Sequence, residues 1–419
     1  MQEEYLHYLF HKKYFGRFFK TAKGVSIEVI DHGVLNTNAG PDFLEAKIKF
    51  DGKIWAGPIE FHVKSSDWLK HKHQFDTAYN NVIAHFVYEN DMAIYTQAFE
   101  LPTVELKSFI NIDHFTHYQK FKNSKAWVQC AQQLGDLDDF ILYQQKEKAF
   151  LERMFRKSTA VLEAYDRFAG DESSVMLHVI AKVFGGKVNQ EPFMQLVAKI
   201  DWQHFRHFHV DLQSFEAYCF GLAGFLNFTK APDAYAEALQ NIYGYQKKMW
   251  KLEGLKEMEW KFSRMHPAGF PTVRIAQFAS LLKVLYKTGI GNVDWENFDA
   301  QDIAISIYWQ THYHFAKTQR KSRKSLSKDF KYLLYINAYI PFLFAKGIRL
   351  DRSALKEHAL EAMNHIPAEK NTILKNWSKV GVQAKTAFDS QSLIEMKNEY
   401  CKQQRCLQCK IGQKLIGYI

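Results

Sequence analysis

The sequence has few cysteines and no long uninterrupted hydrophobic run. Five cysteines among 419 residues are too few and too unevenly spaced for a secreted fold held together by disulfides. The longest apolar stretch, residues 333–345, contains Pro341 and is too short to cross a bilayer. A basic-then-apolar leader is also missing, because Glu3 and Glu4 come early. We therefore expect a soluble cytoplasmic protein with no membrane partner.

Repeats of fixed period and low-complexity linkers are missing too, and the remaining composition is that of a globular chain. Hydrophobic residues make up 47% of the sequence and aromatic residues 15%, which is enough to build packed cores. The length suits two or three domains. The formal net charge of +10 and the pI near 9.0 favour an anionic partner, with nucleic acid ahead of membrane.

Hydrophobic periodicity divides the chain into two parts. In the first part we expect helices at 3–20 and 68–80 and strands at 25–35, 44–50, 59–64 and 82–88. From about residue 136, apolar residues recur every three or four positions, which predicts a succession of helices. The predicted fold class is therefore α+β. A small mixed α/β domain at 1–120 is followed by a mostly helical domain at 136–419.

The best candidate for a site lies within residues 36–68. An Asp-Gly pair at 51–52 separates two alternating runs and predicts a β-hairpin. In the second run one strand face is apolar, and the other carries three polar side chains: Glu60, His62 and Lys64. The hairpin would bring Asp42, at the start of the first run, close to these three side chains.

This set of side chains suits metal-dependent hydrolysis of phosphodiesters. Carboxylates such as those of Asp42 and Glu60 are the ligands that Mg²⁺ and Mn²⁺ prefer, and a bound cation neutralises charge on a phosphate. Lys64 would align the attacking water. His62 would be a third ligand or the general base. The alternative is the solvated face of an antiparallel sheet, with Asp42 as a turn residue.

The predicted order of helix, three strands, helix and strand resembles the core of the PD-(D/E)XK nuclease superfamily. The resemblance implies that Asp42 and Glu60 hold the metal and that Lys64 assists the water. The superfamily places an acid two residues before the lysine, where this chain has His62, and Glu60 lies four residues before it. The chain also resembles an uncharacterised bacterial family of unknown function, through NAGPDF, EFHVKSSDW, HPAGFPTVRIAQ and the terminal cysteines.

Two further histidines follow the candidate strand. His71 and His73 fall in the helix expected at 68–80, where residues two apart point in different directions. That geometry disfavours a metal site shared by the two imidazoles.

Two basic segments are candidates for contacts with the phosphates of DNA or RNA. Arg264 and Arg274 flank a proline-rich turn before a helix, where free backbone N–H groups suit a phosphate. The run at 317–331 has seven Lys or Arg and one Asp, and its candidate contacts are Arg320, Lys321, Arg323 and Lys324. The alternatives are an interhelix connector for the first segment and a solvated surface for the second.

The C-terminus carries Cys401, Cys406 and Cys409 in a C-x4-C-x2-C arrangement. Clustered thiols in a cytoplasmic chain favour a metal site, and Cys130 could supply the fourth ligand to Zn²⁺. Some nucleases of the superfamily resembled here hold an iron-sulfur cluster with one distant and three C-terminal cysteines, which implies a similar layout with different spacing. Buried or free thiols are the alternative.

The prediction that combines these features is a metal-dependent nuclease. Two alternatives stay open: a nucleic-acid-binding or scaffold protein whose nuclease-like core does not cut, and an interaction protein stabilised or redox-regulated by the cysteine cluster.

Overall fold

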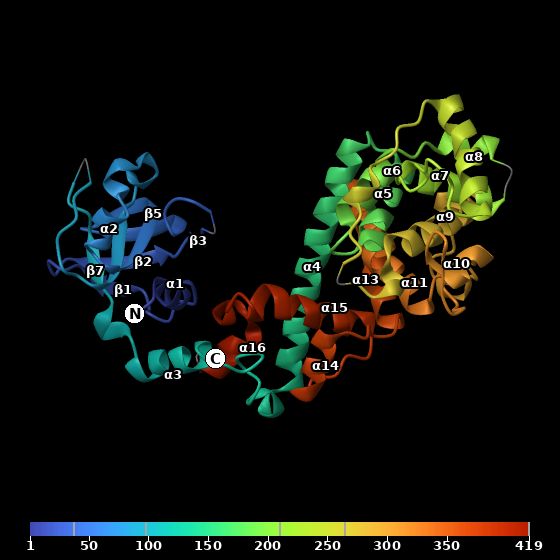
Figure 1. Cartoon of the computed structure of the whole chain (residues 1–419). Coiled ribbons are helices and arrows are strands. Elements are labelled where there is room, and N and C mark those ends of the chain that lie inside the picture. Colours follow the sequence, from blue (N-terminus) through green and yellow to red (C-terminus); the bar gives the residue numbers. More distant parts are fainter. Residues whose placement is uncertain (37, 97–98, 209–210, 264, 418–419) are drawn as a thin grey trace. The chain divides into compact units, whose positions relative to one another are not determined.

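The computed structural model describes residues 1–36, 38–96, 99–208, 211–263 and 265–417 (Figure 1). They form two compact units, each considered by itself. The first unit comprises Met1–Gln145 with Lys397–Ile419, and the second comprises Lys146–Met396.

The first unit is built on a seven-stranded mixed sheet with the strand order β1-β2-β4-β5-β6-β7, in which β3 also pairs with β4. The strands are β1 (Phe18–Lys20), β2 (Ser26–Asp31), β3 (Val34–Leu35), β4 (Phe43–Phe50), β5 (Lys53–Lys64), β6 (Ala84–Glu89) and β7 (Thr103–Glu105). Strands β2, β4 and β5 run antiparallel, whereas β5, β6 and β7 run parallel. Parallel strands are joined by crossover connections that pass over a face of the sheet, so the centre of this sheet is buried.

Helices cover both faces of β5 at its C-terminal end. The helices of this unit are α1 (Glu3–His11), α2 (Asp67–Lys70), α3 (Ile112–Lys122) and α16 (Lys410–Ile416). The ring of Phe10 in α1 lies 5.0 Å from that of Phe61 in β5. On the opposite face Trp68 in α2 packs edge-on against His62, at 6.4 Å between ring centroids. The part of the polar face of β5 that carries Glu60 and His62 is therefore buried rather than solvated.

The β4–β5 hairpin confirms the sequence prediction. Asp51 and Gly52 both have positive φ, 48° and 74°, and Phe50 pairs with Lys53 across the turn. Two successive residues with positive φ match the right-handed twist of the flanking strands. The predicted helix, three strands, helix and strand correspond to α1, β2, β4, β5, α2 and β6, but the structure adds β1 and divides the strand expected at 25–35 into β2 and β3.

In the described residues of the second unit, the named elements are helices and one short hairpin, β8 (His312–His314) and β9 (Lys317–Thr318). Its helices are α4 (Asp139–Arg167, which enters the unit at Lys146), α5 (Glu172–Gly185), α6 (Gln190–Ala198), α7 (Leu212–Leu222), α8 (Ala234–Trp250), α9 (Pro271–Thr288), α10 (Ile307–Thr311), α11 (Lys328–Leu334), α12 (Ile340–Arg349), α13 (Ser353–His365), α14 (Thr372–Lys379) and α15 (Ala387–Glu395). Helices α5, α7 and α9 are buried almost all round and contribute many residues to its core. The α+β fold class is thus confirmed.

Two expected helices end early. The helix expected at 3–20 stops at His11, because Lys13 and Gly16 have φ of 61° and 77°, and β1 follows. The helix expected at 68–80 stops at Lys70, because Lys72 is left-handed with φ of 64°. Hydrophobic periodicity gives no sign of these left-handed lysines, because a lysine rarely adopts a positive φ.

The division into units also differs from the predicted domains. The second unit begins at Lys146 rather than at Asp136, and the last residues, from Lys397 onward, are grouped with the first unit. Among the described helices, none has the length and apolarity to span a bilayer.

Glu216 in α7 is an acidic side chain in the core of the second unit. It is fully buried and accepts a hydrogen bond of 2.6 Å from the hydroxyl of Tyr235. Burial raises the pKa of Glu216 from 4.5 to about 7. The folded unit therefore binds a proton more tightly than the unfolded chain does between these two values.

This proton uptake predicts that stability falls as the pH rises from about 4.5 to about 7. Glu216→Gln keeps an acceptor for Tyr235 and cannot ionise. Between these two pH values, the free energy of unfolding of the variant should therefore fall by up to about 3 kcal/mol less than that of the wild type. Urea unfolding at several pH values measures the difference. Glu237→Gln, at an exposed position of α8, is the control and should follow the wild type. Parallel pH profiles for wild type and Glu216→Gln would contradict the assignment.

Candidate metal centre

The candidate site lies on the buried polar face of β5. Glu60 and His62 are only 4% and 1% exposed. In the adjacent parallel strand β6, His85 pairs with Glu60 and is also fully buried. Because residues two apart on a strand share a face, Glu60, His62 and His85 project to the same side of the sheet, which Trp68 covers.

Four imidazoles form a contiguous cluster on this face. His62 Nδ1 lies 2.8 Å from His85 Nε2, and His62 Nε2 lies 3.1 Å from His71 Nδ1. His62, His71 and His73 each offer one ligand atom within 4.8 Å of the other two. Burial and the neighbouring imidazoles lower the pKa of His62 to about 2 and that of His85 to about 3, so both rings are neutral.

The expectation that His71 and His73 point in different directions was wrong. It assumed a continuous helix, whereas α2 ends at Lys70 and Lys72 is left-handed. The turn brings both imidazoles onto the His62 ring, with centroids at 4.9 Å for His71 and 5.2 Å for His73. Tyr79 stacks on His73 at 3.8 Å and fixes the plane of that ring.

Asp42 and Glu60 meet as predicted. The backbone N–H of Asp42 donates to Glu60 Oε2 at 3.1 Å, and the backbone N–H of Phe61 donates to Asp42 Oδ2 at 2.9 Å. The other Glu60 oxygen, Oε1, lies 3.4 Å from His73 Nε2 and 3.7 Å from His62 Nε2. Burial, with a further contribution from the Asp42 charge, raises the pKa of Glu60 to about 9.

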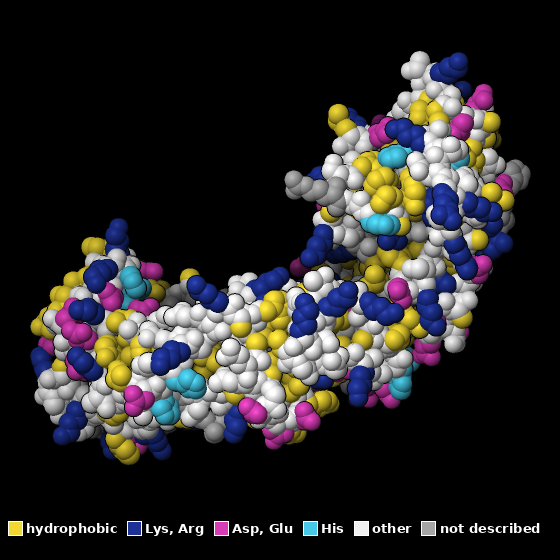
Figure 2. All heavy atoms as spheres, turned by 60° about the horizontal axis from the view of Figure 1, so that its bottom comes forward, with side chains coloured by type: hydrophobic (Ala, Val, Ile, Leu, Met, Phe, Trp, Pro, Cys, Tyr) yellow, Lys and Arg dark blue, Asp and Glu magenta, His cyan; other side chains and the backbone are white. Residues whose placement is uncertain are grey.

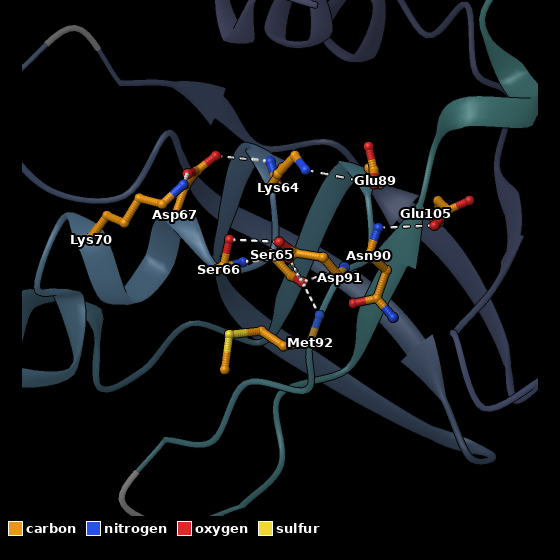
Figure 3. A network of polar contacts seen from close by, with 10 residues as sticks. All are labelled: Lys64, Ser65, Ser66, Asp67, Lys70, Glu89, Asn90, Asp91, Met92 and Glu105. Carbon is orange, nitrogen blue, oxygen red and sulfur yellow. Dashed lines mark hydrogen bonds and ion pairs between the residues drawn. The ribbon is translucent and has the colours of Figure 1, made fainter.

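Lys64 lies away from these carboxylates. Its ammonium group is 3.7 Å from Glu89 Oε1, and its side chain is 45% exposed (Figure 3). Since a strand rises about 3.3 Å per residue, Glu60 and Lys64 are about 13 Å apart along β5. If the acid lay two residues before the lysine, as in the superfamily resembled here, that separation would be half as large. The spacing of four residues in this chain therefore carries Lys64 farther along β5 than the predicted site.

A hydrogen-bonded clasp fixes the end of β5 to the end of β6 (Figure 3). Ser65 and Ser66 both donate hydroxyl hydrogen bonds to Asp91, at 2.8 and 2.7 Å. Although burial acts against it, these hydrogen bonds and the backbone N–H of Ser66 lower the pKa of Asp91 to about 2. Asp67 accepts from the backbone N–H of Lys64 at 2.9 Å and starts α2. The clasp thereby sets where the segment carrying His71 and His73 leaves the sheet.

The whole arrangement lies inside a stretch that matches a known family. The sequence matches the family described as "Protein of unknown function (DUF2851)" over residues 3–372. The chain belongs to this family. The match includes the residues of the cluster and of NAGPDF and EFHVKSSDW, and it ends before the terminal cysteines. No curated protein and no solved structure matches the chain.

The donor set fits a single metal ion. His62, His71 and His73 each offer a ligand atom to a common point, and Glu60 Oε1 lies 3.7 Å from His62 Nε2 and 3.4 Å from His73 Nε2. His62 and Glu60 are buried, whereas His73 is half-buried and His71 is exposed. Nε2 of His73 is buried and makes no hydrogen bond within the described part of the chain, which is costly unless another group binds it. A His62 ring that ligates through Nε2 would donate from Nδ1 to Nε2 of His85, 2.8 Å away, and this hydrogen bond would fix the orientation of the ring.

Sequence reasoning missed His7 and undervalued His85. His7 lies on α1, with Nε2 at 3.2 Å from Asp42 Oδ2 and its ring packed edge-on against Phe61. The sequence contained one indication of His7: it lies four residues after Glu3, and residues four apart share a helix face. Burial raises the pKa of Glu3, and the Asp42 charge acts in the same direction, while His71 and His7 act against it.

The predicted phosphate contacts divide into exposed and internal side chains. Arg320, Lys321 and Arg323 are exposed, and Arg323 pairs with Asp302 at 3.2 Å. Lys324 is only 4% exposed and donates to the carbonyls of Trp309 and His312, so it was wrong to count it as a phosphate contact. Figure 2 shows Lys and Arg side chains interspersed with hydrophobic and acidic ones on the face that it presents.

The two arginines of the proline-rich turn have different outcomes. Arg274 is half-buried, with its guanidinium 3.9 Å from the centre of the Phe330 ring and donating to Gln277 at 2.9 Å. It serves internal packing rather than the predicted phosphate contact. Arg264 lies outside the described residues.

The four cysteines predicted to act together do meet in space. Cys130, Cys401, Cys406 and Cys409 line one cavity in the first unit. Burial, with a further contribution from neighbouring thiols, raises the pKa of Cys130 and of Cys406 to about 12. Cys219 is fully buried in α7, as expected of a core residue.

The histidine cluster predicts metal binding that depends on His73. His73→Ala removes one of three converging imidazoles, so its affinity for Zn²⁺ should fall at least about tenfold. Isothermal titration calorimetry on metal-stripped protein measures the loss. His117→Ala, at an exposed position of α3, is the matched control and should bind as the wild type does. Equal affinities for His73→Ala and His117→Ala would show that the metal binds elsewhere.

Proposed function

We propose that the chain is a metal-dependent nuclease whose catalytic centre is the carboxylate and histidine cluster on β5. One observation carries the proposal: Asp42 and Glu60 meet beside the group formed by His62, His71 and His73. Three imidazoles with one carboxylate favour Zn²⁺ or Mn²⁺ over the Mg²⁺ that two carboxylates alone would prefer.

Each residue has a distinct role in this proposal. Glu60, His62, His71 and His73 hold the cation, while Asp42 keeps Glu60 in place through its backbone N–H. A bound cation supplies a lowered pKa for water and neutralises charge on a phosphate. His7, 3.2 Å from Asp42, is placed to accept a proton, with Asp42 stabilising the imidazolium that forms. His7 thus replaces Lys64 beside the attacking water.

Two features support a phosphodiester substrate. The order α1, β2, β4, β5, α2 and β6, with β1 and β3 added, agrees with the order of elements on which the resemblance to the PD-(D/E)XK superfamily is based. The net charge of +10 and the exposed Arg320 and Lys321 favour a polyanion over a neutral substrate.

A second candidate function rests on the position of Lys64. In the superfamily resembled here a lysine beside the acids assists cleavage, whereas Lys64 pairs with Glu89. This departure favours a nucleic-acid-binding or scaffold protein that keeps the fold and no longer cuts. That candidate predicts binding of nucleic acid that is indifferent to Asp42→Ala.

Cleavage of labelled single- and double-stranded DNA and RNA with EDTA, Mg²⁺, Mn²⁺ or Zn²⁺ tests the proposal. Asp42→Ala and His73→Ala should each lower the metal-dependent rate at least about a hundredfold. Lys64→Ala should stay within about threefold of the wild type, because the exposed Lys64–Glu89 pair contributes little. His117→Ala is again the control.

The outcomes separate the candidates. Binding without cleavage under every metal, unchanged in Asp42→Ala, would establish the second candidate. Cleavage lost in Lys64→Ala as fully as in Asp42→Ala would contradict the proposed roles of His7 and Lys64, and would restore the superfamily arrangement.

A further inference from the structure

The second unit contains a cavity of about 380 Å³ that has no part in the centre on β5. Its walls come from the segment 295–299, from the helical stretch that begins with α11, and from the C-terminal half of α13 with the residue that follows it. The volume lies within the range of sites that bind small molecules. The chemistry of the walls indicates which class of molecule the cavity suits.

The inner wall of the cavity is aromatic. Trp295, Phe298 and Tyr335 line it, and all three are almost completely buried. The ring of Trp295 lies 4.8 Å from that of Phe298 and stacks on that of Tyr339, at 5.2 Å and 15°. This packing holds the rings in place, so the wall offers an apolar surface of fixed shape.

A π-helical turn builds part of the aromatic wall. The turn, Tyr335–Tyr339, continues α11 into α12 without a break. It places the ring of Tyr335, which lines the cavity, 5.4 Å from the ring of Tyr339, which stacks on Trp295. Such turns are rare and are frequently found at functional sites. The turn is thus a second feature, independent of the cavity itself, that points to a binding role.

The solvent-facing side of the cavity is acidic. Glu296 and Glu361 line it and are exposed, and Glu296 Oε1 lies 3.0 Å from His358 Nε2. The segment 294–302 carries four acidic residues and no Lys or Arg, in a chain whose net charge is +10. The mouth of the cavity therefore favours a cation and repels a phosphate.

A lysine also lines the cavity, but its charge is used within the protein. Lys331 is buried, and its ammonium group donates to the carbonyls of Asp299 and Gln301. The carboxylate of Asp299 pairs with Lys328 at 2.9 Å. These contacts secure the turn that carries Phe298, so Lys331 supports the aromatic wall rather than holding an anion in the cavity.

We propose that this cavity binds a small organic amine. The apolar body of the ligand packs on Trp295, Phe298 and Tyr335, and its ammonium group lies beside Glu296 and Glu361 at the mouth. An inorganic cation would leave the aromatic wall without a contact, and the two carboxylates would repel an organic anion. The site is thus a ligand site separate from the proposed nuclease centre.

Isothermal titration calorimetry on the full-length protein with three probes tests this proposal. The probes are 2-phenylethylamine, 2-phenylethanol and 3-phenylpropionate, which share an apolar body and are respectively a cation, a neutral molecule and an anion at neutral pH. The amine should bind with a Kd of about 1 mM or lower. The alcohol should bind more weakly, and the carboxylate should not bind measurably.

Two sets of variants locate the binding. Glu296→Gln combined with Glu361→Gln should weaken binding of the amine at least about threefold and leave that of the alcohol unchanged, because only the amine gains from the carboxylates. Ala362→Phe places a ring in the cavity from α13 and should abolish binding of the amine. Ala354→Phe, at an exposed position of the same helix, is the control and should bind as the wild type does.

Equal affinities of the wild type for the three probes would overturn the proposal, as would no binding of the amine at concentrations up to about 10 mM. Undiminished binding of the amine in Ala362→Phe would place the ligand elsewhere and overturn it too. Because the wild type alone decides the first two outcomes, they do not depend on the folding of a variant. The titrations need no nucleic acid or metal, so their outcome is separate from that of the cleavage assays.

Discussion

The candidate centre depends on the reciprocal hydrogen bonds that join the start of β4 to β5. Asp42 donates its backbone N–H to Glu60, and Asp42 accepts the backbone N–H of Phe61 through its own carboxylate. The ladder between these strands shifts register between Phe43 and Ala46, so side chains secure the strands where backbone pairing is interrupted. These contacts hold one Glu60 oxygen in place and leave the other facing the imidazoles.

Burying this polar group has a cost that the local structure only partly offsets. Phe61, Trp68 and their neighbours exclude water from β5 between Ile59 and His62. A carboxyl and several imidazoles enclosed in this way are favourable only when each polar atom has a partner. Several contacts are present, but Nε2 of His73, Nδ1 of His85 and Nε1 of Trp68 have no hydrogen bond among the described residues. A cation would satisfy His73 Nε2 and would favour ionised Glu60.

Local sequence patterns predict much of the fold and the meeting of Asp42 with Glu60, but they do not predict the approach of His71 and His73. Alternation and the Asp-Gly turn at 51–52 suffice for the β4–β5 hairpin and for the meeting of Asp42 with Glu60. The turn of His71 and His73 toward His62 depends on a left-handed Lys72, a conformation that sequence periodicity does not indicate. Lys324 was misjudged because its carbonyl partners, on Trp309 and His312, are tertiary contacts. Charge runs predict solvent exposure only on average.

X-ray absorption spectroscopy at the zinc edge, on metal-stripped protein loaded with one equivalent of Zn²⁺, tests the central claim most directly. The spectrum should show a first shell of nitrogen and oxygen with the outer-shell scattering of several imidazoles, and His73→Ala should lose one of them. A first shell made of sulfur would place the metal among the cysteines instead. A shell of oxygen alone, without imidazole scattering, would contradict a histidine centre on β5.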